Sequence, residues 1–208
     1  IAARHQVTVW ARAQANRLSR VVISLQQDLA SPHLHGALMT MRRLAGRREP
    51  LPRFDPAHFR DFIWRRLFAR TLPPEDFDAV TRAGFRLARV PWTAMHRAAL
   101  AMRWTGSPVY PRLDTGGFDL MIAETPYPAT VSPGTQLVVR YHDAIPLLMP
   151  HTIADRPFHR ASHYHALRRN VLDGAWFACV AEATRADLLA VFPEAGPRSL
   201  TIHNMVSH

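Results

Sequence analysis

The sequence contains no lysine, only one cysteine and no long hydrophobic run. The single cysteine, Cys179, cannot form a disulfide framework within the chain. We therefore expect a cytoplasmic protein in which this thiol is a core side chain. No apolar stretch reaches the ~18 residues that a membrane-spanning helix requires. The sequence begins at Ile1 without a methionine and stops at His208, and we expect both ends to be cuts within a longer protein.

All 26 basic residues are arginine, and with 16 acidic residues they give a formal net charge of +10. Arginine stays charged at physiological pH and forms bidentate contacts with phosphates and carboxylates. This balance indicates an anionic partner, which nucleic acid, an anionic membrane surface or a diphosphate-bearing substrate would each provide. The chain has 208 residues, of which 48% are hydrophobic, so it is long enough for one sizeable domain with a core.

The first half of the sequence predicts a helical section that follows a segment of mixed pattern. Alternating apolar residues predict strands at 5–10 and 20–25, whereas proline and glycine predict a loop at 31–36 and a connection at 46–56. Apolar residues at helical spacing predict an added helical section over about residues 55–105. The expected helices of this half cover residues 37–45, 59–70, 76–89 and 92–104.

The last ninety residues alternate short apolar runs with helical patterns. The expected strands cover residues 118–123, 136–141, 175–180 and 199–202, and the expected helices cover 157–172 and 184–192. This alternation predicts an α/β fold with a Rossmann-like parallel sheet and helices on its faces. Ligands of such sheets bind at the carboxyl ends of the strands, where polar residues stand in this sequence.

Four short motifs follow one another in this half. One strand ends in His142-Asp143 and runs into an apolar segment with Pro146, and the next runs into Ala181-Glu182-Ala183-Thr184-Arg185-Ala186-Asp187-Leu188. Phe192-Pro193 follows, and the last strand ends in the turn 203–206. In order and spacing these motifs resemble the second half of the N-terminal domain of family 4 glycosyltransferases.

The resemblance implies that residues 1–208 are the N-terminal, acceptor-side half of a GT-B fold, with the C-terminal, donor-binding half absent from this chain. It implies a retaining transfer from a nucleotide sugar to a glycan or lipid-linked acceptor in polysaccharide biosynthesis, without cofactor or metal. The fragment alone should be inactive. Two residues depart from the family pattern, because Ala181 replaces a serine and Met205 replaces a glycine. The glycine-rich loop of the family is not recognisable.

His142 and Asp143 are the catalytic candidates that the resemblance implies. A histidine at a strand end can hydrogen-bond a sugar hydroxyl while positive charge develops on the donor ring, and Asp143 can orient the imidazole. The alternatives are a structural histidine and a turn-forming aspartate, an N-cap at Thr184 completed by Asp187, and a simple proline-rich turn at 125–128. The substrate-binding candidates are Tyr127, Arg140, Glu182, Thr184, Arg185 and Asn204.

The predicted helix at 59–70 interleaves aromatic and arginine residues. Such a helix can lie on an anionic membrane, which would place the protein at the inner face of the plasma membrane. It can equally pack its apolar side into the domain with the arginines directed outward. The membrane-facing candidates are Trp64, Arg65, Arg66 and Phe68.

Other functions remain open at this level. His159 and His163 are one helical turn apart, a spacing that suits metal ligands, but no further ligand stands nearby in the sequence and we expect no metal site. A nucleic-acid-binding module would explain the net charge, yet the arginines are dispersed and no nucleic-acid-binding motif is present, so we expect no nucleic acid partner. A non-catalytic α/β binding module is the other alternative.

Overall fold

The computed structural model describes residues 32–55, 57–82, 84–88, 90, 92–101 and 107–204. The strands predicted at 5–10 and 20–25 and the end of the predicted turn at 203–206 lie outside these residues. The described residues form two compact units, one within Leu51–Arg89 and the other within His33–Pro50 and Val90–His208. Each unit is described by itself below.

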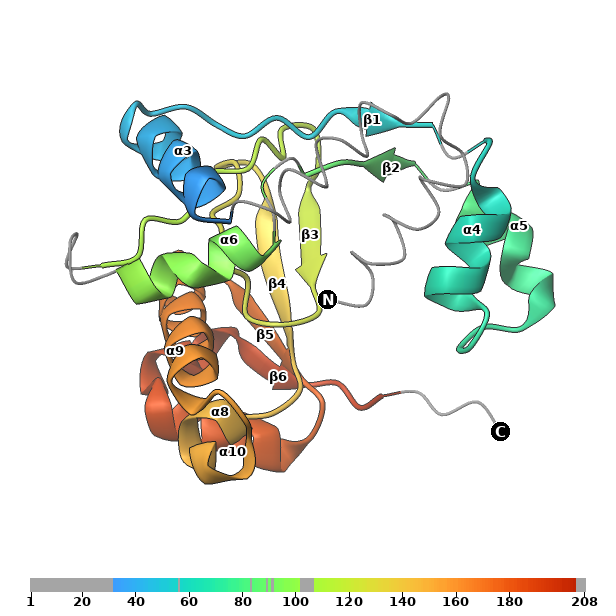
Figure 1. Ribbon diagram of the computed structural model, residues 1–208. Helices are drawn as coiled ribbons and strands as arrows, with labels where there is room; N and C mark the ends of the chain where they lie inside the picture. Colours follow the sequence, from blue (N-terminus) through green and yellow to red (C-terminus); the bar gives the residue numbers. More distant parts are fainter. Residues whose placement is uncertain are drawn as a thin grey trace. The chain divides into compact units, whose positions relative to one another are not determined.

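The smaller unit, within Leu51–Arg89, holds a two-stranded antiparallel sheet and two short helices (Figure 1). Its elements are β1 (Arg53–Phe54), α4 (Arg60–Ile63) continued by a π-helical segment (Trp64–Phe68), a 3-10 turn (Pro74–Asp76), α5 (Phe77–Thr81) and β2 (Phe85–Arg86). The helix expected at 59–70 is therefore present from Arg60 to Phe68, with its second part π-helical. The helix expected at 76–89 is wrong after Thr81. Gly84 is a poor helix residue, and the chain beyond it pairs with β1 instead of continuing the helix.

The larger unit is built on a four-stranded sheet in which every strand is parallel to its neighbours. Its strands are β3 (Leu120–Ala123), β4 (Gln136–Tyr141), β5 (Trp176–Cys179) and β6 (Ser199–Thr201), in the spatial order β3-β4-β5-β6. The prediction of an α/β fold with a parallel sheet and flanking helices is confirmed. The apolar runs are short and bounded by proline, glycine and polar residues, which is why they form strands and not longer helices.

Helices cover one face of this sheet. They are α8 (Ile145–Leu148), α9 (Arg156–Leu172) and α10 (Glu182–Val191), with 3-10 turns at Pro150–Thr152 and Pro193–Arg198. The core lies between them and alternate strand residues, so that Val139, Phe177 and Cys179 pack with Leu167 of α9 and Leu188 of α10. The strands follow one another in one direction across the sheet, and right-handed connections therefore place all these helices on the same side.

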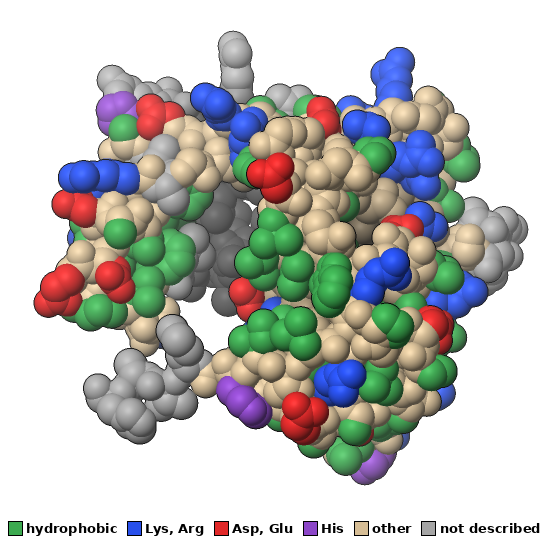
Figure 2. Space-filling model, turned by 180° about the vertical axis from the view of Figure 1, so that it is seen from behind, with side chains coloured by type: hydrophobic (Ala, Val, Ile, Leu, Met, Phe, Trp, Pro, Cys, Tyr) green, Lys and Arg blue, Asp and Glu red, His purple; other side chains and the backbone are tan. Residues whose placement is uncertain are grey.

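The opposite face of the sheet carries large apolar side chains that stay accessible. Ile122, Val138 and Trp176 occupy one register row across three strands, and Ile122 is 61% exposed. Leu120, Leu200 and Ile202 extend this apolar surface. Seen from behind, hydrophobic side chains gather over the sheet (Figure 2). Parallel sheets are normally covered on both faces, and among the described residues the helices that follow the strands cover one.

The rest of the larger unit precedes the sheet in the sequence. It comprises α3 (Pro32–Leu44), α6 (Trp92–Arg97) with a 3-10 turn (Ala98–Ala101), and an extended segment in which Glu49 bridges to Leu113. The loop expected at 31–36 is wrong from Pro32 onward, because proline is well suited to the first position of a helix. The helix expected at 92–104 is α-helical to Arg97 and continues as the 3-10 turn to Ala101, and its last three residues lie outside the described ones. None of the described helices is long and apolar enough to cross a membrane.

Candidate functional site

Polar residues follow the carboxyl end of each strand in the four-stranded sheet. Glu124 follows β3, His142 and Asp143 follow β4, Glu182 begins α10 after β5, and Asn204 lies just after β6. Because the four strands are parallel, these ends lie along one edge of the sheet. The predicted residues His142, Glu182 and Asn204 therefore share this edge, as the sequence indicated.

His142 is fixed through its backbone and exposed through its side chain. Its carbonyl oxygen accepts a hydrogen bond from the Thr184 hydroxyl at 3.4 Å. Its Nε2 lies 3.6 Å from a carboxylate oxygen of Glu124, and the two side chains are 44% and 80% exposed. Glu124 was not predicted, although its place directly after a strand was a usable signal. The pair places an imidazole and a carboxylate side by side at the sheet edge.

Asp143 stabilises the turn after β4. Its carboxylate accepts a hydrogen bond from the backbone N–H of Ile145 at 2.9 Å, where the short helix α8 begins. The carboxylate is also close enough to raise the pKa of His163 on α9 against the effect of burial. These contacts match the turn-forming alternative for Asp143, and the carboxylate that lies beside His142 is instead that of Glu124.

Arg140 and Asn204 are joined across the sheet. A guanidinium nitrogen of Arg140 donates to the side-chain oxygen of Asn204 at 2.6 Å. Arg140 lies opposite Ala178 in the register of β4 and β5, and β6 follows on the far side. The small alanine side chain leaves space for the arginine to cross β5. Two predicted binding residues thus meet at the same edge although 64 positions separate them.

Thr184 and Arg185 have structural partners within the unit. Ala181 is the N-cap of α10, so the predicted cap at Thr184 is wrong. Thr184 is buried and bonds to the His142 backbone instead. The Arg185 Nε donates to the carbonyl oxygen of Ser199 at 3.2 Å and lies 3.1 Å from its hydroxyl, which ties α10 to the start of β6. The structure therefore does not group the Arg185 side chain with His142.

Tyr127 is held by a residue that the sequence did not reveal. Asn170 of α9 is fully buried, and its amide accepts from the Tyr127 N–H at 2.8 Å and donates to the Tyr127 carbonyl at 2.9 Å. The Tyr127 ring packs 5.8 Å from that of Trp92, and burial raises the pKa of Tyr127 to about 12. The proline-rich turn is thus anchored on the core, and no sequence signal distinguishes Asn170 from other helix residues.

The buried Tyr141 and the half-buried histidines His96 and His163 form a cluster near the sheet edge. The hydroxyl of Tyr141 and Nε2 of His163 are 3.4 Å apart. Burial lowers the pKa of His163 to about 4. Burial also lowers the pKa of His96 to about 4, and the charges of His163 and His159 lower it further. Both imidazoles are therefore neutral at pH 7. His163 lies on the side of α9 that packs toward the core.

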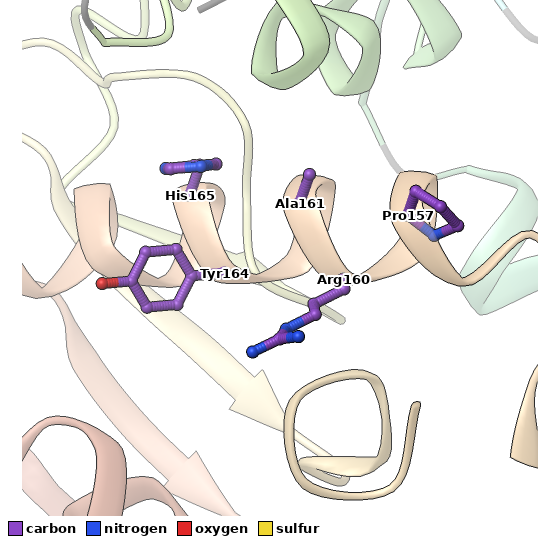
Figure 3. Close-up of a pocket in the computed structure, with 5 residues that line it drawn as sticks. All are labelled: Pro157, Arg160, Ala161, Tyr164 and His165. Atoms are coloured by element: carbon purple, nitrogen blue, oxygen red, sulfur yellow. The ribbon is translucent and has the colours of Figure 1, made fainter. Parts of the chain in front are cut away.

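A cavity of about 300 Å³ opens on α9 (Figure 3). Arg160 and Tyr164 point to one side of the helix, and Ala161 and His165 point to the other (Figure 3). The Tyr164 ring also packs 5.6 Å from that of Phe192. The described residues that line this cavity all belong to α9, and none of them is a predicted site residue.

The membrane-facing candidates belong to the smaller unit. The Trp64 ring lies 5.6 Å from that of Phe77 of α5, edge to face, and Arg60 stacks over the same Phe77 ring. Trp64 and Phe68 are half-buried, Arg65 is exposed, and the side chain of Arg66 is outside the described ones. Core packing thus accounts for part of the aromatic pattern, while the charged side of the helix stays accessible.

The described residues contain no cluster of three or more histidine, cysteine, aspartate or glutamate side chains that could hold a metal ion. Comparison with known proteins gives no family model, no curated protein and no solved structure that matches this chain.

Proposed function

We propose that the intact protein is a glycosyltransferase of the family 4 type, and that this chain forms its acceptor-side domain. The observation that carries the proposal is the Glu124–His142 pair at the carboxyl edge of the parallel sheet, joined there by the Arg140–Asn204 contact. The order of the four motifs in residues 138–206 adds to it. Parallel sheets of this kind bind ligands at that edge.

The chemistry of the edge suits transfer of a sugar. In a retaining transfer the donor ring gains positive charge while a diphosphate leaves. The exposed imidazole of His142 can hydrogen-bond a sugar hydroxyl, and the Glu124 carboxylate lies beside it, 3.6 Å from its Nε2. Arg140, held by Asn204, adds a fixed positive charge that an anionic acceptor or the leaving group can meet. Asp143 supports this arrangement by shaping the turn.

The test is release of nucleoside diphosphate by the full-length protein from a panel of nucleotide sugars, with and without crude lipid and glycan acceptors. We expect slow hydrolysis of one donor, which an acceptor accelerates. The His142→Ala variant should lose this activity, whereas His151→Ala, which changes an exposed histidine of the 3-10 turn Pro150–Thr152, should retain it. Absence of turnover with every donor, although the wild-type protein is folded and binds an anionic ligand, would favour the non-catalytic binding module.

A further inference from the structure

A second cavity, of about 320 Å³, lies in the larger unit away from the candidate site. The end of α3, the segment before Pro111 and the last turn of α9 form it. The last turn of α9 leads through Gly174 into the start of β5, so this cavity is at the amino-terminal edge of the sheet. Its lining residues are Arg43, Leu44, Ser107, Pro108, Val109, Tyr110, Thr130 and Arg169.

The cavity carries an excess of positive charge. Burial lowers the pKa of Arg43, and the neighbouring guanidiniums of Arg112 and Arg169 lower it further. Arg169 is neutralised by Asp173, to which it donates two hydrogen bonds of 2.8 and 2.7 Å. Among the described residues, neither Arg43 nor Arg112 forms an ion pair. The Arg43 guanidinium therefore lines the cavity without an ion-pair partner among the described residues, and Arg112 adds a second positive charge near it.

Arg43 is held in a fixed orientation. Its Nε donates to the carbonyl oxygen of Tyr110 at 3.0 Å, which leaves the two terminal nitrogens of the guanidinium without a partner in the described part of the chain. The Tyr110 hydroxyl is buried and also has no hydrogen-bond partner there. A guanidinium with its two terminal nitrogens free is the group that binds an oxyanion through two parallel hydrogen bonds.

We propose that this cavity binds the phosphate group of a small phosphomonoester with an apolar body. A phosphate dianion can meet the Arg43 guanidinium that lines the cavity, the nearby charge of Arg112 adds to the attraction, and the Thr130 hydroxyl supplies a further donor. Phosphate alone is too small for a cavity of about 320 Å³. The remaining space is bordered by Leu44, Pro108 and Val109, which suit a compact hydrocarbon group.

Calorimetric titration of the chain with inorganic phosphate and with phenyl phosphate, in phosphate-free buffer at low ionic strength, tests this assignment. We expect both to bind, phenyl phosphate more tightly. Arg43→Gln should weaken phenyl phosphate binding by about tenfold or more, and Arg112→Gln by a few fold. Arg168→Gln makes the same change of charge at an exposed position on α9 next to Arg169, and it should bind like the wild type. Circular dichroism melting verifies that each variant is folded.

Three results would overturn the proposal. The first is equal phenyl phosphate binding by the wild type and a folded Arg43→Gln variant. If Arg43→Gln does not fold, unchanged binding by Arg112→Gln would also overturn the proposal. The second is an equal loss in Arg168→Gln, which would indicate diffuse attraction by the basic surface. The third is benzoate binding as tightly as phenyl phosphate, which would make the cavity a carboxylate site.

Discussion

At the residue scale, the backbone and the side chain of His142 have different roles. Its carbonyl oxygen receives the Thr184 hydroxyl and fixes the start of α10 against the end of β4. Its imidazole is 44% exposed and lies beside the Glu124 carboxylate. Removing the side chain therefore leaves the backbone contact in place.

This division predicts opposite effects of His142→Ala on activity and on stability. In the full-length protein, loss of one hydrogen bond in the transition state should lower kcat by about a hundredfold, or about 3 kcal/mol. The melting temperature should change little, because an exposed side chain contributes about 1 kcal/mol or less. Turnover and melting are to be measured on the same preparation. Near-normal turnover with a clearly lowered melting temperature would make His142 a structural residue.

For Asn170 we expect the substitution to lower stability. Its fully buried amide satisfies both backbone groups of Tyr127, and Asn170→Ala leaves these groups unpaired. We expect a loss of about 2–3 kcal/mol in the free energy of unfolding, measured with urea. Asn204→Ala removes an exposed amide and should cost below about 0.5 kcal/mol. Equal losses for the two variants would contradict the anchoring role of Asn170.

At the element scale, the two faces of the sheet differ in how they are covered. Leu137 of β4 is 5% exposed beneath the helices, whereas Ile122 of β3 is 61% exposed on the other face. Leu137→Ala should therefore destabilise the unit by about 2–4 kcal/mol and Ile122→Ala by less than about 1 kcal/mol. Urea unfolding of both variants measures the difference. A large cost for Ile122→Ala would mean that another part of the protein covers this face in solution.

The helical segment of the smaller unit carries a prediction about membranes. Each arginine near an anionic surface adds about 1 kcal/mol of attraction, and a buried aromatic side chain adds about 2 kcal/mol. Arg65→Glu combined with Arg66→Glu should therefore reduce sedimentation of the intact protein with anionic liposomes. Neutral liposomes serve as the control. Equal binding of wild type and variant would assign this helix to core packing alone.

At the scale of the whole molecule, the half-buried histidines His96 and His163 couple stability to pH. The pKa values of His96 and His163 are about 4 in the fold, below the ordinary value of 6.5. The unfolded chain therefore binds more protons between these values, and stability that is present above about pH 6.5 is lost as the pH falls toward 4. The Trp92 ring packs against His96. The Tyr141 hydroxyl lies 3.4 Å from His163, and the Asp143 carboxylate acts on the same ring.

Urea unfolding at pH 7.5 and at pH 5 measures this effect. We expect a loss on the order of 2 kcal/mol for the wild type on acidification, and a smaller loss for His96→Leu/His163→Leu. His151→Ala is the control, because that side chain is exposed, and it should behave like the wild type. The same pH dependence in the double variant would show that carboxylates alone cause it.

The amino-acid sequence by itself determined the four strands of the sheet, their parallel arrangement and the polar residues that follow them. Short apolar runs separated by helical patterns carry this information locally, because strand length and alternation depend on neighbouring residues. The helix expected at 76–89 failed for the opposite reason. Pairing between β1 and β2, about 30 residues apart, outweighed the local helical pattern, and pairing at such a separation leaves no local signal.

Only the tertiary structure decided which side chains meet. The register of the strands sets Glu124 beside His142, and the small Ala178 allows Arg140 to reach Asn204. The buried contact of Asn170 and the group of guanidiniums around Arg43 likewise join residues that are distant in the sequence. These contacts depend on packing distances of a few ångströms, which follow from how whole elements are arranged. Residue type and spacing along the chain do not predict these contacts.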